Sequence, residues 1–514
     1  MGRCLATAAQ MREMDRRAIE VRGIPSLTLM ENAARAVAGA VIEHAAARFP
    51  AGPPDKGRAH RAVLFCGPGN NGGDGVAAAR LLLAAGWQVR ALLVGKREKM
   101  TRDCREMEAR LLAVGERLID FTPGSPEIIA WTMEANVIVD AVFGIGLNSP
   151  VRGDALAAIA LMNQSPAPTL AVDLPSGVAA DTGVVLGAAV NCVKTISFTL
   201  PKIGQFVGKG ALHAGQVIVA PIGIPEDLVP GGSSGPVRTV EAEDARLPRR
   251  ARDAHKGHFG RLYCLAGSVG YTGAPVLAAR AAVRSGAGLV TLAVPEEVYP
   301  IVAVKCDEAM PRPLPADYPG ILAQAADSQV ALIGPGLGRA PRTARLVRAL
   351  LKDLSCPVVL DADGINAVSG HINSLDGRAE RGLLTVLTPH DGEFGRLGGD
   401  LSSGDRLGAA RDFAAARGCI LVLKGHRTIT AFPDGTAYVN TTGNPGMAKG
   451  GSGDVLAGVI AALLGQGLVP RMAVPAAVWL HGRSGDLAAR QKGEYSMTPS
   501  DMIEYLPQAM RLEE

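Results

Sequence analysis

Short apolar runs alternate with helix-length segments along the first half of the chain. The runs stay apolar throughout and end in Gly, Pro, Asn or Asp, a pattern typical of strands buried on both faces of a parallel sheet. We therefore predict an α/β domain with a doubly wound sheet, preceded by helical segments at residues 7–22 and 27–49. The predicted strands are residues 61–66, 87–94, 136–143, 169–175, 194–200 and 216–223.

The same rhythm returns in the second half, which predicts a second α/β domain. The two halves share this rhythm but no sequence motif. Since the 514 residues exceed the roughly 250–300 that one hydrophobic core accommodates, two domains are the expected arrangement. The predicted strands of the second domain are residues 261–267, 288–295, 329–336, 357–364, 383–389 and 419–425, followed by a hairpin around the turn at 433–435.

The apolar rhythm is interrupted between residues 224 and 255, where Pro, Gly, Ser and mixed charges dominate. We predict domains at residues 1–224 and 251–514, joined by a linker at 225–250. The arginines of this stretch could form a patch for a partner or a nucleic acid. The acidic residues between them favour a solvated connector instead.

Composition narrows the class of protein. Hydrophobic residues make up 47% of the chain and charged residues 20%, which excludes a disordered or collagen-like protein. The 53 basic residues nearly balance the 49 acidic residues, so we expect small-molecule partners rather than nucleic acid. Aromatic residues make up only 4%, and cores of Ala, Val, Leu and Ile suit parallel sheets under closely packed helices.

The sequence shows neither a signal-like apolar segment at its start nor an apolar run long enough to cross a membrane. The eight cysteines lack the spacing of a zinc site or a redox motif, so we expect reduced, mostly buried thiols. We expect a cytoplasmic protein that forms a homo-oligomer and has no membrane partner.

The first candidate site begins with GPGNNGGDG at residues 67–75, between a predicted strand and a predicted helix. Its glycines allow backbone amides to approach an anionic group, although a glycine-rich turn can also be only a tight connection. Asp140 and Asp173 end two further strands, so their carboxylates would line the same crevice. Oxygen atoms of Asn71, Asp140 and Ser176 could hold a cation.

At these residues the first half resembles the NAD(P)H-hydrate epimerase family. The resemblance runs from TAAQMREMD near Thr7 to Gly223 and includes NNGGDG, a D-x-x-x-G-x-G element and a D-x-P-S-G element in this order. It implies that Asn71, Asp140 and Ser176 hold potassium. The implied substrate contacts are Asn70, Asn71, Gly72, Gly73, Asp74, Gly144, Ile145, Gly146, Leu147, Asn148, Ser149, Pro150 and Asp173.

This family interconverts the R and S forms of hydrated NADH and NADPH (NADHX and NADPHX). Moving a hydroxyl group on an electron-rich ring requires a group that transfers a proton, and Asp173 at a strand end is our candidate for that group. Lys202 is either an electrostatic helper or an ordinary surface lysine.

The second candidate site is NPGMAKGGSGDVLAGVIAALL at residues 444–464, a glycine cluster that leads into an apolar helix predicted to begin at Asp454. Amides of residues 450–453 would point into a concavity at the positive end of this helix, where charge develops on a transferred phosphoryl group. Asp454 stands beside them as a base for a hydroxyl proton. The alternative is that Asp454 only caps the helix.

The second half resembles the ribokinase-like superfamily and, within it, the NAD(P)H-hydrate dehydratases. The motifs are the segments at 255–290, 333–339, 360–366, 388–397 and 423–428 together with the glycine-rich helix entry. The resemblance implies hydrate contacts at Gly336, Gly338, His390, Asp391, Gly392, Glu393, Phe394, Gly395, Arg396 and Asp454. It implies nucleotide contacts at Lys424, Gly425, His426, Arg427, Thr428, Asn444, Pro445, Gly446, Met447, Ala448, Lys449, Gly450, Gly451, Ser452 and Gly453.

Several of these residues have ordinary alternatives. Asp361 and Asp363 could orient substrate or magnesium, or could only form a turn with the following glycine. Lys424 could pair with phosphates or be an exposed lysine. Asp391 stands where the family more often has proline, which concerns the local turn rather than the chemistry.

Together the two resemblances imply a bifunctional enzyme that repairs hydrated nicotinamide cofactors. Asp454 would deprotonate the hydroxyl of the S hydrate, which attacks the terminal phosphoryl group of a nucleotide bound with Mg²⁺, and the ring nitrogen would then expel phosphate. ADP is favoured over ATP because the family's two-domain members use it. The alternatives are a ribokinase-like small-molecule kinase with an N-terminal binding domain, and a first domain that serves only as a scaffold.

Overall fold

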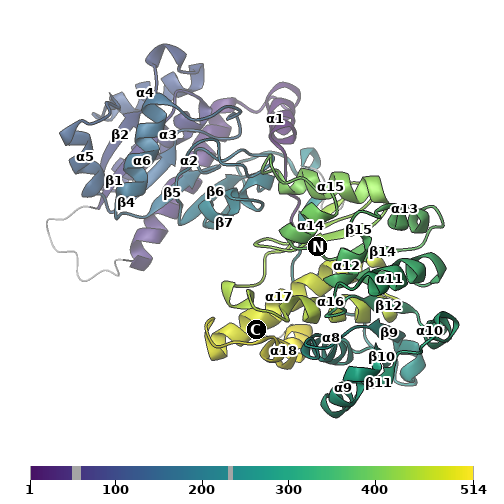
Figure 1. Ribbon diagram of the computed structural model, residues 1–514. Coiled ribbons are helices and arrows are strands. Elements are labelled where there is room, and N and C mark those ends of the chain that lie inside the picture. The colour runs from purple at the N-terminus through teal and green to yellow at the C-terminus, as the bar shows by residue number, and fades with distance from the viewer. Residues whose placement is uncertain (1, 49–59, 230–235, 513–514) are drawn as a thin grey trace. The chain divides into compact units, whose positions relative to one another are not determined.

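The structure is a computed structural model that describes residues 2–48, 60–229 and 236–512. It divides into two compact units: Cys4–Gly235, here the N-terminal unit, and Met1–Arg3 with Pro236–Glu514, here the C-terminal unit. Each unit has its own sheet (Figure 1). Among the described helices, none combines the length and the apolar composition that crossing a bilayer requires.

The N-terminal unit is built on a seven-stranded sheet in the order β3-β2-β1-β4-β5-β6-β7. All of its strand pairs are parallel. The strand order reverses between β1 and β4, as the doubly wound prediction requires. The bounds are β1 Arg61–Cys66, β2 Gln88–Leu93, β3 Leu118–Asp120, β4 Val137–Ala141, β5 Thr169–Val172, β6 Lys194–Phe198 and β7 Gln216–Ala220.

Helices cover both faces of this sheet because its strands are apolar on both sides. In β1, Leu64 packs in a cluster with helices α2, α3 and α4, whereas Phe65 packs in another with α5 and α6. Residue 49, at the end of the predicted segment 27–49, lies outside the described residues. The helices are α1 Ala8–Arg16, α2 Ser26–Arg48, α3 Asn70–Ala84, α4 Arg102–Ala113, α5 Pro126–Met133, α6 Gly153–Gln164 and α7 Gly210–His213, with a π-helical turn at Arg17–Val21.

The C-terminal unit contains a ten-stranded sheet in the order β11-β10-β9-β12-β13-β14-β15-β16-β17-β8. The predicted hairpin is present as the antiparallel pair β16 and β17, and β15 is also antiparallel to β16. The remaining pairs are parallel. The bounds are β8 Val237–Thr239, β9 Arg261–Leu265, β10 Leu289–Val294, β11 Met310–Pro313, β12 Val330–Ile333, β13 Val358–Leu360, β14 Thr385–Leu387, β15 Ile420–Leu423, β16 Ile429–Ala431 and β17 Ala437–Val439.

Strand β8 lies inside the stretch 225–250 that the sequence suggests is a linker. It pairs with β17, and all three of its residues are buried. These three residues of the predicted linker are therefore part of the sheet of the C-terminal unit. Three residues are too short a run for a period of two to be recognised, and the pairing partner lies about 200 residues further along the chain.

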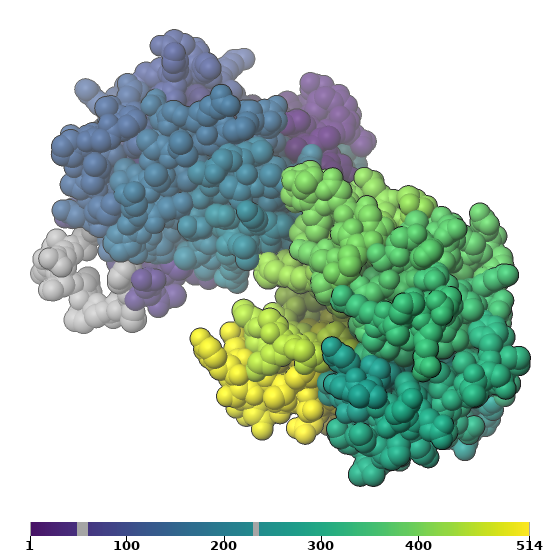
Figure 2. Space-filling model, viewed as in Figure 1, coloured from purple at the N-terminus to yellow at the C-terminus, as the bar shows by residue number. Residues whose placement is uncertain are grey.

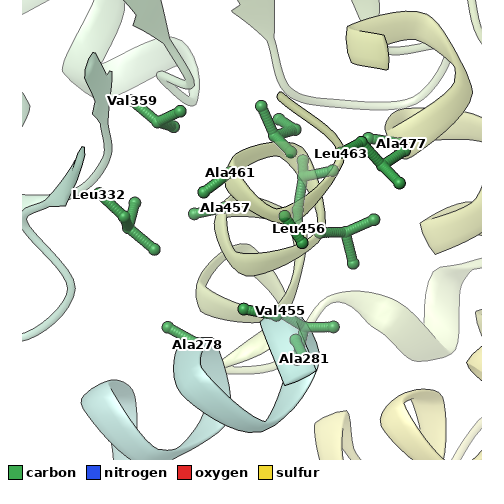
Figure 3. Close-up of a cluster of buried hydrophobic side chains, with 14 of the residues drawn as sticks. Ala278, Ala281, Leu332, Val359, Val455, Leu456, Ala457, Ala461, Leu463 and Ala477 are labelled. Carbon is green, nitrogen blue, oxygen red and sulfur yellow. The ribbon is translucent and has the colours of Figure 1, made fainter. Parts of the chain in front are cut away.

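Helix α16 (Ser452–Gly465) is the central helix of the C-terminal unit, and nearly all its residues are buried. Figure 3 shows its side chains between α8, α17 and the strand residues Leu332 and Val359. A Cβ at Gly458 would collide with the carbonyl oxygen of Ala278, so glycine permits the close crossing of α16 and α8. This packing fixes the first turn of α16.

The other helices of the C-terminal unit follow the predicted alternation with strands. They are α8 Gly273–Arg284, α9 Tyr299–Lys305, α10 Tyr318–Ala325, α11 Pro341–Asp353, α12 Asp363–Val368, α13 Asn373–Ala379, α14 Asp391–Arg396, α15 Arg406–Arg417, α17 Pro470–Lys492 and α18 Pro499–Arg511. The eight cysteines are free thiols, and all but the half-buried Cys356 are buried, as expected.

Candidate active sites

The N-terminal unit contains a cleft of about 650 Å³ beside the carboxyl ends of β1, β4 and β5. The crevice outside a reversal of strand order is where doubly wound sheets bind ligands. All three sequence motifs of the first candidate site contribute to its lining. The predicted contact residues that line it are Asn70, Asn71, Asp74, Gly144, Ile145, Gly146, Leu147, Asn148, Ser149 and Asp173.

Three predicted contact residues, Gly72, Gly73 and Pro150, do not line the cleft. The two glycines belong to the first turns of α3, which begins at Asn70 rather than after the glycine cluster. A Cβ at Gly72 would collide with the carbonyl oxygen of Gly67. These glycines therefore let the helix pack closely, which places its first residues at the cleft.

Asp173 and Lys202 form a buried ion pair at this cleft. The Lys202 side chain is fully buried, and its ammonium contacts the Asp173 carboxylate. It also donates to the Ser197 hydroxyl at 3.1 Å and to the Phe198 carbonyl at 3.0 Å. The reading of Lys202 as a surface lysine is wrong, because a buried ammonium needs partners of this kind.

The backbone of Asp173 is held in an uncommon conformation. Its φ is 63°, a region that residues other than glycine rarely adopt. The Gln205 side-chain amide donates to the Asp173 carbonyl at 2.6 Å, and the Phe198 amide donates to its carboxylate at 3.2 Å. These contacts fix the carboxylate at the cleft, where a strained residue is often functional.

Further carboxylates line the cleft. Burial and, next, the charge of Asp173 raise the pKa of Asp15 to about 6, although Lys202 opposes this. Burial, followed by the charge of Asp173, also raises the pKa of Asp74 well above its usual range. The sequence reasoning missed Asp15 and Asp103 as lining residues, although Asp15 lies in the segment TAAQMREMD that carries the family resemblance.

Asp140 and Ser176, two of the predicted potassium ligands, are in direct contact. Ser176 donates to the Asp140 carboxylate from its amide at 2.7 Å and from its hydroxyl at 2.5 Å. Burial raises the pKa of Asp140 to about 6, against the effect of these hydrogen bonds and of one from Val142.

The third predicted ligand, Asn71, lies next to this pair. A Cβ at Gly144 would be 3.0 Å from Oδ1 of Asn71, and the neighbouring Phe143 contacts the Ser176 hydroxyl through both its amide and its carbonyl group. The Asn71 amide nitrogen is buried, and no described atom is its hydrogen-bond partner. Amide, hydroxyl, carboxylate and carbonyl oxygens thus gather in one place, a donor set that fits a potassium ion.

The C-terminal unit places Asp454 in the first turn of α16. Burial and, next, the charge of Asp361 raise the pKa of Asp454 to about 7, although Lys424 opposes this. Asp454 is therefore a carboxyl group that can hold or release a proton near neutral pH. The surface of the C-terminal unit is hollowed between its yellow-green part and its green and teal parts (Figure 2).

Lys424 links the acidic residues around the start of α16. Its ammonium donates to Asp361 at 2.9 Å and lies 3.9 Å from the Glu393 carboxylate. Burial alone lowers the pKa of Lys424, but these two carboxylates raise it above its usual value. A Cβ at Gly453 would lie 3.2 Å from the Lys424 ammonium. Lys424 is therefore an ion-paired residue of the site and not an exposed lysine.

Asp361 and Asp363 have different environments. Asp361 is 1% exposed and also accepts a hydrogen bond from the Thr388 hydroxyl at 2.7 Å. Asp363 begins α12 and accepts from the Gly338 amide at 2.8 Å and from the Asn366 side chain at 3.1 Å. Asp361 thus belongs to the charged site, whereas Asp363 orders the loop that carries the predicted contact Gly338.

His390 and Glu393 form a capping box at the start of α14. Nδ1 of His390 accepts from the Gly392 amide at 3.0 Å, and Glu393 accepts from the His390 amide at 3.0 Å. Asp391 forms an ion pair with Arg406, in which Nη1 of the arginine lies 2.7 Å from each carboxylate oxygen. This pair stabilises the local turn at the position where the family more often has proline.

The remaining residues of the predicted 390–396 segment differ in how far they are buried. Phe394 is fully buried, with its ring 5.3 Å from that of Phe413, so it supports the site from within the core. Gly395 and Arg396 are exposed. Arg396 donates to the Asn366 side chain at 2.8 Å, which ties α14 to α12.

Predicted nucleotide contacts at the 444–453 segment also differ in burial. Asn444 donates to Asp486 at 3.0 Å, while Gly446 is buried and Met447 packs against Gly485. These contacts anchor the segment on α17. The exposed residues are Pro445, Ala448, Lys449 and Gly450.

Ser452 connects this segment to a buried histidine. Its hydroxyl is buried without a partner among the described residues, and its carbonyl lies 2.9 Å from Nε2 of His481. Burial lowers the pKa of His481 to about 4, so a neutral ring donates this hydrogen bond. The sequence reasoning missed His481.

The 424–428 segment forms a tight turn. Gly425 and Arg427 have positive φ values of 155° and 60°, and Arg427 donates to the Thr441 carbonyl at 3.1 Å. The Thr428 hydroxyl donates to the Gly425 carbonyl at 3.1 Å. Burial lowers the pKa of His426, the remaining predicted residue of this turn.

Fold and sites define a two-domain α/β enzyme with a carboxylate-lined cleft in one unit and a glycine-rich helix entry beside an acidic cluster in the other. The family described as NAD(P)H-hydrate dehydratase matches residues 262–508, and the family described as YjeF-related protein N-terminus matches residues 26–204. The chain belongs to the family of bifunctional NAD(P)H-hydrate repair enzymes.

Curated relatives match over nearly their whole length. The bifunctional NAD(P)H-hydrate repair enzyme of Moorella thermoacetica is 41% identical over 522 residues, covering 99% of this chain and 96% of that protein. The enzyme of the same name from Thermofilum pendens is 36% identical, with 99% and 96% covered. Among solved structures, the ADP/ATP-dependent NAD(P)H-hydrate dehydratase from Bacillus subtilis, co-crystallized with ATP/Mg²⁺, is 33% identical, with 53% of this chain and 97% of that chain covered and a TM-score of 0.46.

These findings confirm the expected fold class, a doubly wound N-terminal domain followed by a ribokinase-like domain. They also confirm that the chain is a bifunctional enzyme of NAD(P)H-hydrate repair, with an isomerase part and a lyase part. The full-length match speaks against the alternative of a kinase with an accessory binding domain.

Proposed function

We propose that the N-terminal unit interconverts R and S NADHX and NADPHX in its cleft, with Asp173 as the group that accepts and returns the proton. The observation that carries this proposal is the ion pair between the Asp173 carboxylate and the buried Lys202 ammonium. The contact with the ammonium and the fixed backbone hold the Asp173 carboxylate at the cleft, in the position that a proton-transfer group requires.

A potassium ion would be held by Asn71, Asp140 and Ser176. When bound, it would supply a positive charge that attracts the anionic phosphates of the substrate. The chain itself contributes the start of α3, where Asn70 and Asn71 line the cleft at the positive end of the helix.

We propose that the C-terminal unit dehydrates the S hydrate in a nucleotide-dependent reaction, with ADP as the favoured nucleotide. Asp454 accepts the hydroxyl proton, and the hydroxyl oxygen attacks the terminal phosphoryl group, which produces AMP. The lone pair of the ring nitrogen then expels phosphate, and the ring carbon next to the former hydroxyl-bearing carbon loses a proton to the released phosphate, which restores the ring double bond of dihydronicotinamide. The amides of residues 450–453 stabilise the charge on the transferred group.

The cluster of Lys424, Asp361 and Glu393 supports this chemistry. Lys424 lies beside Gly453, where it neutralises a phosphate oxygen, and its pairing with Asp361 holds it there. Mg²⁺, when bound with the nucleotide, would shield the phosphates. Oδ2 of Asp361 accepts none of the hydrogen bonds described above and would lie 3.9 Å from a Cβ at Gly453, which fits a Mg²⁺ held by few carboxylates together with phosphates and water.

The decisive experiment mixes the purified protein with resolved S or R hydrate and with ADP or ATP, and follows the return of dihydronicotinamide absorbance. We expect recovery of the S form with ADP, and recovery of the R form at a rate faster than spontaneous epimerisation allows. Recovery of neither epimer with either nucleotide would overturn the proposal. The same assay with NADHX and NADPHX measures the cofactor preference.

We further propose that the protein works in the cytoplasm and forms a homo-oligomer. The eight free thiols suit a reducing compartment. Light scattering on the purified protein tests the oligomeric state, and a mass equal to a single chain would contradict it.

A further inference from the structure

The C-terminal unit contains a second pocket, of about 530 Å³, away from the residues of either candidate site. It is bordered by the segment 247–259, by the end of α8, by the end of α16 and by α18. From Asp454 to Gln466 at this pocket, α16 runs roughly 18 Å at about 1.5 Å per residue. The pocket therefore lies at the opposite end of the helix from the proposed phosphoryl-transfer site.

The ionisable side chains that line the pocket are all basic. They are Arg249, Arg250, Arg284 and His258, and no carboxylate residue lines it. None of the ion pairs among the described residues involves these three arginines. Arg284 also borders a smaller depression lined by acidic residues of other segments. Since none of the three is ion-paired among the described residues, the charge of Arg249, Arg250 and Arg284 is available to an anion.

Arg250 is held in place by several contacts. It donates to the Gly286 carbonyl at 2.6 Å and to the Gln466 side chain at 2.9 Å. Its guanidinium carbon lies 3.9 Å from the centroid of the Phe259 ring, a cation–π arrangement that fixes its orientation. A guanidinium that is already ordered loses little entropy when it binds an anion.

The floor of the pocket has an unsatisfied polar group. Ser285 is 2% exposed, and its hydroxyl has no hydrogen-bond partner among the described residues. A buried hydroxyl without a partner is unfavourable, so a ligand atom that reaches it is stabilised. Around it the walls are apolar, with Leu247, Leu463, Leu468 and Met510.

We propose that this pocket binds a small organic anion, a molecule with an apolar or aromatic body and a terminal phosphate or carboxylate. The arginines receive the anionic end, and the apolar walls receive the body. Pockets of this size, mostly apolar with a few fixed polar groups, are typical of small-molecule sites.

Phenyl phosphate is a suitable probe, and calorimetric titration of the full chain measures its binding. The test variant is Arg249→Gln/Arg284→Gln, because no described hydrogen bond or ion pair is broken by these changes. The matched control is Arg342→Gln/Arg345→Gln, which removes the same charge from exposed positions of α11. Phosphate binding at the active site contributes equally to all three proteins and subtracts out.

We expect the test variant to bind the probe at least about tenfold more weakly than the control, since charge-assisted hydrogen bonds are lost. We also expect wild-type protein to bind phenyl phosphate more tightly than inorganic phosphate or phenol. Equal binding by the two variants, or by phenyl phosphate and inorganic phosphate, would overturn the proposal. The proposal would also be overturned if wild-type protein did not bind phenyl phosphate and the test variant changed its oligomeric state. That result would mean that the pocket is an interface between copies of the chain.

Discussion

At the scale of single residues, the Asp173–Lys202 pair is the best example of what burial adds to a sequence pattern. The two residues lie 29 positions apart, and β6 together with a short 3-10 helix at Ile203–Gln205 brings them together. A lysine in a sequence looks the same whether it is exposed or buried. Its role follows only from the tertiary contacts that surround the ammonium.

Replacing Lys202 with Met tests this pair. We expect recovery of the R hydrate to fall to the rate set by spontaneous epimerisation, while recovery of the S hydrate with nucleotide continues. The uncompensated Asp173 charge also lowers the free energy of unfolding by about 3–5 kcal/mol. The exposed Lys209→Met is the control. If Lys202→Met epimerises at the wild-type rate, the ammonium has no part in the reaction.

Asp454 allows a second test at this scale. We expect Asp454→Asn to slow recovery from both epimers by at least about 100-fold, because the base is lost. The exposed Asp412→Asn leaves the rate unchanged. Recovery of the S hydrate by Asp454→Asn at more than a tenth of the wild-type rate would mean that another residue accepts the proton.

The raised pKa of Asp454 gives this site a pH dependence. Its pKa is about 7 in the folded protein against an ordinary value of 3.8, so the base is mostly protonated in mild acid. The rate of S-hydrate dehydration at saturating nucleotide should rise with pH up to about 7 and then level off. A rate that is flat between pH 5.5 and 7 would contradict this assignment.

The same shift has a consequence for stability. Between pH 3.8 and about 7 the folded state binds the Asp454 proton more tightly than the unfolded state, so the contribution of this group decreases as pH rises through that window. Denaturant unfolding at several pH values therefore should show Asp454→Asn gaining stability relative to wild type up to about pH 7. A constant difference across the window would contradict the shift.

At the scale of elements, long apolar strands could be predicted from the sequence, and short or glycine-rich elements could not. The strands β1, β4 and β9 follow their predicted runs closely, because an apolar run buried on both faces has few alternatives. The predicted hairpin at the turn 433–435 is also present. The short strands β3 and β8 were not predicted, since three residues carry little periodicity.

The start of α3 shows why the sequence predicts the glycine-rich motif as a turn before the helix rather than as part of it. Glycine has low helix propensity, so local preference favours a turn at NNGGDG. The structure nevertheless begins the helix at Asn70, because glycine at position 72 permits contact with the Gly67 carbonyl. Tertiary packing decides the element, and sequence propensity alone could not reveal it.

Gly72→Ala tests this packing. The added methyl group collides with a backbone oxygen, which a side chain cannot relieve by rotating, so we expect a loss of about 1–3 kcal/mol in the free energy of unfolding. The matched control is Gly39→Ala in α2, where a Cβ meets nothing within 4 Å and where alanine favours the helix. Denaturant unfolding measures both. Equal stabilities for the two variants would mean that the α3 entry tolerates a side chain.

At the scale of the whole molecule, the sequence predicted two domains, and each unit of the structure has its own sheet and core. Many of the candidate site residues could be placed from the sequence because the motifs that carry them directly follow predicted strands in both halves. The supporting residues, such as Asp15 and His481, were missed because they come from helices that meet the sites only through tertiary packing.

Because the two candidate sites lie in separate units, we expect two variants that are each defective at one site to complement each other. A mixture of Lys202→Met and Asp454→Asn proteins should recover the R hydrate, since one protein supplies the S form and the other dehydrates it. The two variants alone should recover it only slowly or not at all. Failure of the mixture, with each variant retaining its intact activity, would show that the intermediate passes between sites without entering solution.

The first residues of the chain belong to the unit that is synthesised last. The Arg3 amide donates to the Thr239 hydroxyl at 3.0 Å, the Thr239 amide donates to the Arg3 carbonyl at 3.0 Å, and Arg238 donates to the Gly2 carbonyl at 2.6 Å. Residues 2 and 3 must therefore wait, during translation, until more than 230 residues have followed them before they find their partners on β8. In chain order, the N-terminal unit is an insertion within the C-terminal unit. A tag fused to the start of the chain would therefore be attached next to the edge strand β8 of the dehydratase unit and not to the epimerase unit.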